Sequence, residues 1–152
     1  MAAKKKKRSS QKVPKKMSKK GSVSAFAKRS WAEWILRIGI AGEFLGHGVF
    51  ALQVKQGWLP YFASVGIGEA TATTLLPLIG IMDIAVALIV LLRPWKVVLA
   101  WAAVWGFWTA LMRPIAGQPI WDFIERWANF AAPLALLAIQ GWPKKVKDWF
   151  KV

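Results

Sequence analysis

The chain has 152 residues, of which 56% are hydrophobic, and a formal net charge of +15. It contains no cysteine, which excludes disulfides, thiolate metal sites, iron–sulfur clusters and thiol redox chemistry. The charge is concentrated at one end, because 12 of the 22 lysine and arginine residues lie in positions 1–30, where there is no acidic residue. The rest of the chain is nearly neutral, and its apolar residues form blocks too long for the helices of a soluble core. These features predict an all-α polytopic membrane protein.

Residues 1–30 form the first predicted region, a basic cytoplasmic tail. The tail has too few apolar residues to offset the entropy cost of ordering, so we expect it to be disordered. Its charge suits anionic lipid headgroups or an acidic partner. Nucleic acid is not expected as a partner, because no folded motif or interleaved aromatic residues accompany the lysines. The tail residues expected to contact lipid or a partner are Lys4, Lys5, Lys6, Lys7 and Arg8.

Residues 31–141 are predicted to form a four-helix transmembrane domain. The expected spans lie at about 31–54, 71–92, 95–112 and 120–140. At 1.5 Å of rise per residue, the first two are long enough to cross a hydrocarbon core of roughly 30 Å. Proline after Arg93 and after Arg113 marks the two boundaries of the third span. We expect the first span to be a retained anchor, because it is longer than the apolar region of a signal peptide.

The lysines of residues 142–152 set the predicted orientation together with the tail. Val146, Trp149 and Phe150 recur at helical spacing, which predicts a short basic amphipathic helix at the membrane interface. Its lysines expected to contact lipid or a partner are Lys144, Lys145 and Lys147. Because basic residues favour the cytoplasmic side, both termini are expected there, which four spans allow.

Ionisable residues interrupt segments that otherwise resemble membrane spans. On translocon scales a central Asp, Arg or Lys costs roughly 2.5–3.5 kcal/mol, so such residues normally face the bundle interior. In the last span four polar residues follow the i, i+3, i+4, i+7 pattern of one helix face. They are Asp122, Glu125, Arg126 and Asn129. The whole predicted polar cluster, central to outward-facing, comprises Glu43, His47, Asp83, Arg113, Glu125, Arg126 and Asn129. We expect Arg126 to pair with Glu43, Asp83 or Glu125.

This cluster has two interpretations: polar contacts that fix the bundle geometry, or a site for a ligand, a proton or a quinone. A candidate aromatic wall for a flat ring or a lipid tail consists of Trp101, Trp105 and Trp108, for which plain packing is the alternative. No catalytic residue is assigned and no metal is expected, since one histidine without cysteines is a poor ligand set. Quinone or lipid is the ligand class left open. Packing against a neighbouring helix is the expected role of Gly39, Gly42 and Gly46.

Five short segments of residues 31–141 carry a resemblance to a known family. They are LRIG at 36–39, FLGHG at 44–48, PLIGIMD at 77–83, WGFWTALMRP at 105–114 and ERWAN at 125–129. With these segments the chain resembles the DoxX-like family of small four-helix bacterial membrane proteins. The resemblance implies a four-helix bundle in the bacterial cytoplasmic (inner) membrane. It also implies a link to thiosulfate–quinone oxidoreduction and to redox or stress-related membrane complexes. The missing cysteines and the added basic tail depart from the family, so catalytic activity is not carried across.

The predicted function is that of a small integral subunit or accessory factor of a larger membrane complex concerned with electron transport. One alternative is a stand-alone quinone-linked oxidoreductase subunit, or a small-molecule or proton carrier, that uses the polar cluster. The other alternative is a purely structural assembly protein. Enzymatic activity stays open, with the preference for a non-enzymatic role. The expected partners are anionic membrane lipids and the subunits of that complex.

Overall fold

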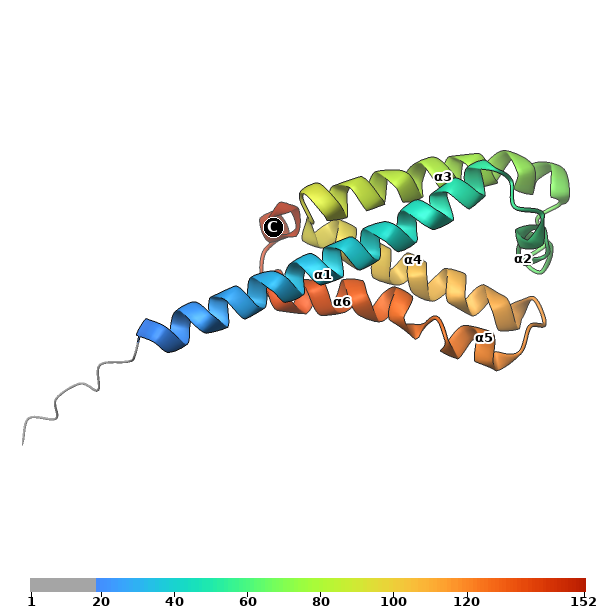
Figure 1. Cartoon of the computed structure of the whole chain (residues 1–152). Coiled ribbons are helices and arrows are strands. Elements are labelled where there is room, and N and C mark those ends of the chain that lie inside the picture. The colour runs from blue at the N-terminus through green and yellow to red at the C-terminus, as the bar shows by residue number, and fades with distance from the viewer. Residues whose placement is uncertain (1–18) are drawn as a thin grey trace, which may run out of the picture.

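The computed structural model describes residues 19–152, which fold into helices connected by short turns (Figure 1). In chain order the elements are α1 (Lys19–Leu52), the 3-10 helix η1 (Gln56–Trp58), α2 (Leu59–Ala63), α3 (Glu69–Leu92), α4 (Lys96–Ile115), α5 (Ile120–Ile124), α6 (Trp127–Gln140) and the 3-10 helix η2 (Val146–Phe150). No strand occurs within these residues, which confirms the all-α prediction for them.

Three of the helices are long and apolar enough to cross a membrane. They are the part of α1 from Ser30 to Leu52, the whole of α3 and the whole of α4. Many large apolar side chains on the outside of the bundle are exposed, among them Ile35, Leu78 and Val104. An outer surface of this kind suits hydrocarbon better than water.

The fourth predicted span is interrupted, so the prediction of one helix over 120–140 is wrong. α5 ends at Ile124 and α6 begins at Trp127. The 14 residues of α6 reach about 21 Å at 1.5 Å per residue, less than a hydrocarbon core of roughly 30 Å. Polar contacts stabilise the break, since Arg126 pairs with Glu125 and donates from Nη1 to the backbone oxygen of Asp122 at 2.9 Å. A side chain that binds a backbone carbonyl in this way replaces a helical hydrogen bond.

The start of α1 also differs from the prediction. The helix begins at Lys19, so disorder was wrongly predicted for residues 19–30. Extending a helix that already exists adds a hydrogen bond per residue without a new nucleation cost, and alanine and lysine are good helix formers. The predicted lipid or partner contacts of Lys4, Lys5, Lys6, Lys7 and Arg8 lie outside the described residues.

The C-terminal segment, for which a short amphipathic helix was predicted, contains the 3-10 helix η2. The carboxylate of Asp148 accepts hydrogen bonds from the backbone N–H of Lys145 at 3.0 Å and from Nζ of Lys151 at 2.7 Å. These bonds span three residues and favour the tighter turn. The side chains of Lys144, Lys145 and Lys147 are exposed. The backbone N–H of Lys96 donates to the Lys151 oxygen at 3.4 Å, which attaches the segment to the start of α4.

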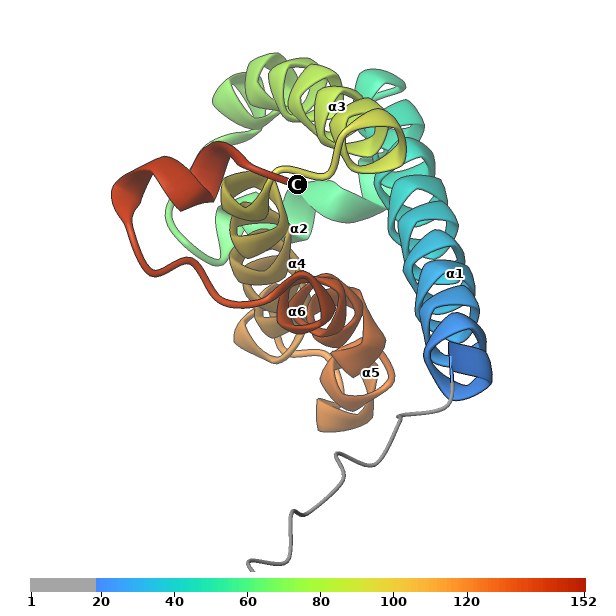
Figure 2. The same cartoon turned by 90° about the vertical axis from the view of Figure 1, so that its left-hand side faces the viewer.

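The helices α1, α3, α4 and α6 alternate in direction along the bundle (Figure 1). α1 packs along α3, α4 packs along α6, and α1 also meets α6 (Figure 2). Their contact surfaces form one core, in which the largest buried side chains include Ile40, Phe44, Leu99 and Leu136. Figure 1 shows the start of α1 and the C-terminus toward the same end of the bundle, opposite α2.

Glycines bring the paired helices into close contact at two places. A Cβ atom added to Gly80 would lie 2.7 Å from the backbone oxygen of Gly48, so α1 and α3 cross there backbone to backbone. A Cβ atom added to Gly106 would lie 2.8 Å from the backbone oxygen of Asn129, where α4 crosses α6. The packing role predicted for Gly39, Gly42 and Gly46 is wrong, because a Cβ atom at these positions would have nothing within 4 Å in the described chain.

Candidate ligand-binding cavity

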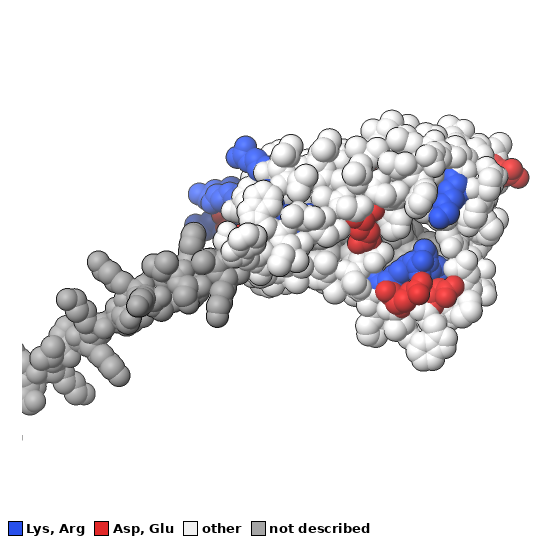
Figure 3. Space-filling view, viewed as in Figure 1, with Lys and Arg blue, Asp and Glu red and all other residues white. Residues whose placement is uncertain are grey.

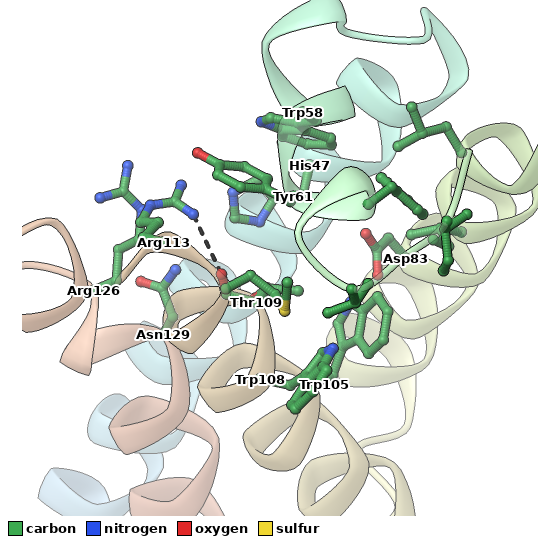
Figure 4. Close-up of a pocket in the computed structure, with 16 residues that line it drawn as sticks. His47, Trp58, Tyr61, Asp83, Trp105, Trp108, Thr109, Arg113, Arg126 and Asn129 are labelled. Atoms are coloured by element: carbon green, nitrogen blue, oxygen red, sulfur yellow. Dashed lines mark hydrogen bonds between the residues drawn. The ribbon is translucent and has the colours of Figure 1, made fainter. Parts of the chain in front are cut away.

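A cavity of about 230 Å³ lies among α1, α3, α4 and the break between α5 and α6, at the end of the bundle that carries α2 (Figure 4). A volume of roughly 10–15 Å³ already holds one water, so this cavity has room for a small molecule. Figure 3 shows a cluster of acidic and basic side chains at the α5 end of this face, beside a hollow. One acidic group lies nearer the middle of the bundle, and basic groups lie at the opposite end.

Five members of the predicted polar cluster line the cavity. They are His47, Asp83, Arg113, Arg126 and Asn129. The other two do not line it. Glu43 lies one helical turn from His47, with its Oε1 at 3.9 Å from the histidine Nδ1, and the side chain of Glu125 is 60% exposed. The fold therefore brings together residues from α1, α3, α4 and α6 that are far apart in the sequence.

Asp83 is the most buried polar residue of the wall. It lies on α3, one turn after the close approach at Gly80, and only 3% of it is exposed. Trp105 of α4 also lines the cavity and lies beside this carboxylate (Figure 4). The Oδ1 atom of Asp83 is buried and has no hydrogen-bond partner among the described residues. Leaving a buried acceptor unsatisfied costs about 1–3 kcal/mol or more for a charged group, so such an atom calls for an explanation.

Two arginines enter the cavity from different elements. Arg113 is in the last turn of α4 and is 9% exposed. It donates from Nη1 to the backbone oxygen of Thr109 at 3.3 Å, and its guanidinium carbon lies 5.4 Å from the centre of the Tyr61 ring. Arg126 precedes the first residue of α6. The predicted pairing of Arg126 with one of three carboxylates is confirmed, and the partner is Glu125.

The segment between α1 and α3 closes the end of the cavity. The aromatic residues Trp58, Tyr61 and Phe62, from η1 and α2, all line it. The Tyr61 hydroxyl donates to Oε1 of Gln118 at 3.2 Å, which joins this segment to the turn after α4. Trp58 packs edge-on against His47 with 5.7 Å between ring centres. The sequence analysis missed these residues, although three aromatic side chains within five positions of a predicted external loop were a usable signal.

The tryptophans of α4 divide between the cavity and the outside. Trp105 and Trp108 line the cavity. Trp101 does not, but its ring stacks on that of Trp105 with 5.8 Å between centres and 14° between planes. Aromatic surface is therefore present on two sides of the cavity, from α4 and from η1 and α2.

The residues around the cavity suit a small molecule better than a metal ion. Within residues 19–152, no three histidine, aspartate or glutamate side chains gather as a metal site requires.

Comparison of the chain with protein-family models, curated proteins and solved structures finds no match. Its relation to the DoxX-like family therefore stays a prediction that rests on the five segments quoted above.

Proposed function

We propose that this chain is an integral membrane protein whose helical bundle binds an amphiphilic small molecule in the cavity. The observation that carries the proposal is the Asp83 carboxylate, which is 3% exposed, borders the cavity and leaves Oδ1 without a partner. Polar residues that only hold helices together satisfy one another. A buried oxygen that faces an open volume and has no protein partner instead suits a hydrogen-bond donor on a ligand.

The lining of the cavity indicates the shape of the ligand. Apolar and aromatic side chains form most of the wall, including Trp58, Trp105, Leu76 and Ile79. Such a wall accommodates a flat ring or an acyl chain, while the few polar groups orient a head. A lipid, or a quinone in its reduced quinol form with hydroxyl donors, meets both requirements. The proposal is one of binding, and it assigns no catalytic residue.

The proposed placement in the membrane counts α5 and α6 together as a fourth, discontinuous crossing. Broken helices are tolerated at membrane depth where they are buried in protein or line a cavity, as the break at Arg126 does. The alternating directions of the long helices support this placement. Basic residues at both ends of the chain favour cytoplasmic termini, which puts the cavity in the outer half of the membrane. A reporter fused after Val152 and found outside the cytoplasm would contradict this topology.

A role as an accessory subunit of an electron-transfer complex in the bacterial cytoplasmic membrane stays a prediction. A ligand-binding bundle is compatible with that role, because a subunit can hold a quinone or a lipid within a larger assembly. Purification in mild detergent tests it directly: larger subunits that remain bound support the accessory role, and a monodisperse chain alone argues against it.

Tryptophan quenching by a quinone tests the binding proposal. Three of the 11 tryptophans line the cavity, and a bound quinone quenches nearby indoles. We expect decylubiquinone to quench purified protein in lipid nanodiscs saturably, above the linear quenching caused by quinone dissolved in the bilayer. Decylubiquinol, whose hydroxyl groups can donate to the Asp83 carboxylate, should displace the quinone. Asp83→Asn replaces the carboxylate at nearly constant size and should raise the decylubiquinol concentration needed for displacement about tenfold, which is about 1.4 kcal/mol.

The matched control is Glu69→Gln, because Glu69 is an exposed carboxylate in the first turn of the same helix and does not line the cavity. This variant should bind decylubiquinol like the unmodified protein. Equal decylubiquinol affinities of the Asp83→Asn and Glu69→Gln variants, or quenching that never saturates, would refute the proposal.

A further inference from the structure

We infer that the ligand of the cavity carries an oxyanion, a phosphate or a carboxylate group, which is held between Arg113 and Arg126. This inference rests on the proposed binding function and specifies the chemistry of the ligand's head.

The first observation is the environment of Arg113. More than nine-tenths of this residue is buried, and it lines the cavity. A guanidinium has five N–H donors, of which one bonds to the backbone oxygen of Thr109. Within the described chain, no carboxylate oxygen lies within 4 Å of it. A buried cation without a contacting anion is strongly unfavourable, so the remaining donors call for an acceptor in the cavity.

The second observation is a like charge nearby. Arg126 lines the same cavity and lies within electrostatic reach of Arg113. Its Nη1 atom is already bonded to Glu125 and to the backbone oxygen of Asp122. The carboxylates of Asp122 and Glu125 act on Arg113 only from beyond contact distance. An anion between two guanidiniums removes their repulsion and fits the planar donor geometry of both.

Further positive groups lie near this part of the cavity. His47 lies within electrostatic reach of Arg113, Arg126 and also Lys55. The N-terminal end of α6, which begins one residue after Arg126, adds the positive end of a helix dipole. Figure 4 shows the Asp83 carboxylate across the cavity from both arginines. Glu43 acts on Arg126 electrostatically, but within the described chain it makes no ion pair with either arginine.

The polar groups thus divide the cavity into two ends. The arginine end binds the oxyanion, and the Asp83 end accepts a hydrogen bond from a donor such as a hydroxyl group. The aromatic wall between them, which includes Trp105 and Trp108, contacts the apolar part. The oxyanion belongs either to an amphiphile or to a free anion, and both sources present the same oxygens to the guanidiniums.

Competition against a neutral probe tests the inference. Decylubiquinone quenching reports occupancy of the cavity, and dodecyl phosphate, dodecanol and inorganic phosphate serve as competitors. We expect dodecyl phosphate to displace the quinone at a concentration about tenfold lower than dodecanol does, since hydrogen bonds between charged groups are stronger than those of a neutral hydroxyl. Displacement by inorganic phosphate at a similar concentration would identify a free anion as the ligand, whereas its failure would identify the amphiphile.

Two variants locate the anion site. Arg126→Gln should abolish the preference for dodecyl phosphate over dodecanol, and Arg126→Lys should retain part of it because the charge remains. Far-UV circular dichroism shows whether both variants fold. The preference is the ratio of the two competitor concentrations within one variant, so a change in quinone affinity does not affect it. Arg93→Gln is the control, because Arg93 is an exposed arginine in the turn between α3 and α4 and does not line the cavity. It should keep the full preference.

The outcomes separate the two proposals. Absence of saturable quinone binding would refute the binding function itself. Saturable binding without a preference for the phosphate amphiphile, or with an equal preference in the Arg126→Gln and Arg93→Gln variants, would overturn the anion inference alone.

Discussion

A methyl group added at Gly80 should push α1 and α3 apart and destabilise the bundle. The Cβ atom of alanine at this position would lie 2.7 Å from the Gly48 oxygen and 2.9 Å from the Leu52 nitrogen, both backbone atoms. Comfortable contacts of carbon are near 3.5–4.0 Å, so the helices must separate by roughly 0.8 Å or more. Overpacking of this kind costs about 1–3 kcal/mol.

Helix propensity opposes this cost. Replacing glycine by alanine inside a helix gains about 0.8–1 kcal/mol, so the net effect of Gly80→Ala is a loss of up to about 2 kcal/mol. Gly42→Ala provides the matched comparison, because a Cβ atom there would meet nothing within 4 Å. This variant therefore has the gain in helix propensity without the overpacking cost. The difference in unfolding free energy between the two variants, about 1–3 kcal/mol, therefore isolates the overpacking cost.

Reversible unfolding in mixed micelles, followed by far-UV circular dichroism as the fraction of dodecyl sulfate rises, measures this difference. Gly80→Ala should unfold at a lower fraction than the unmodified chain, and Gly42→Ala at an equal or higher one. The double variant Gly48→Ala/Gly80→Ala should lose less than the sum of the single losses, because one separation of the helices relieves both contacts. If Gly80→Ala is as stable as Gly42→Ala, the close crossing of α1 and α3 does not exist.

Two further predictions concern the end of the bundle that carries the C-terminus. Arg37 of α1 donates from Nε to the Val90 oxygen at 3.2 Å and also to the Leu91 oxygen, so it satisfies carbonyls at the end of α3. Arg37→Met should lower the unfolding free energy by about 1–3 kcal/mol in the same titration, and an unchanged midpoint would show that these bonds contribute nothing. The pKa of Asp148 is lowered, chiefly by the hydrogen bond from Lys151 and next by backbone N–H groups. A lowered pKa means that its stabilising effect on η2 is present above the unfolded pKa of about 3.9 and is lost as the pH falls through the folded value. Lys151→Met should raise the pKa of Asp148 in a carboxyl carbon NMR titration, and a pKa equal to that of the unmodified chain would contradict the assigned cause.

Local sequence was sufficient to predict the all-α class and most of the polar residues that line the cavity. Long apolar runs predicted the three helices that can cross a membrane. The free energy of transfer into hydrocarbon is set by each residue and its neighbours in sequence. Charged residues within such runs predicted that His47, Asp83 and Arg126 would turn toward one interior, since the cost of facing lipid does not depend on the fold. The same reasoning placed Glu43 and Glu125 in the cluster, where the fold does not bring them to the cavity.

Tertiary structure decided which side chains meet. A helical wheel assumes an unbroken helix, so it could not show that one helix would end at Ile124 and that another would begin beside the cavity, just after Arg126. The pairing of Gly48 with Gly80 depends on how two helices cross, and the neighbours of a glycine in sequence carry no information about that. The segment holding Tyr61 closes the cavity through contacts with distant residues, such as the bond of the Tyr61 hydroxyl to Gln118, 57 residues away. The sequence by itself determined which residues must avoid lipid, because that energy belongs to each residue. Where those residues meet is a property of contacts between distant helices, which only the folded chain possesses.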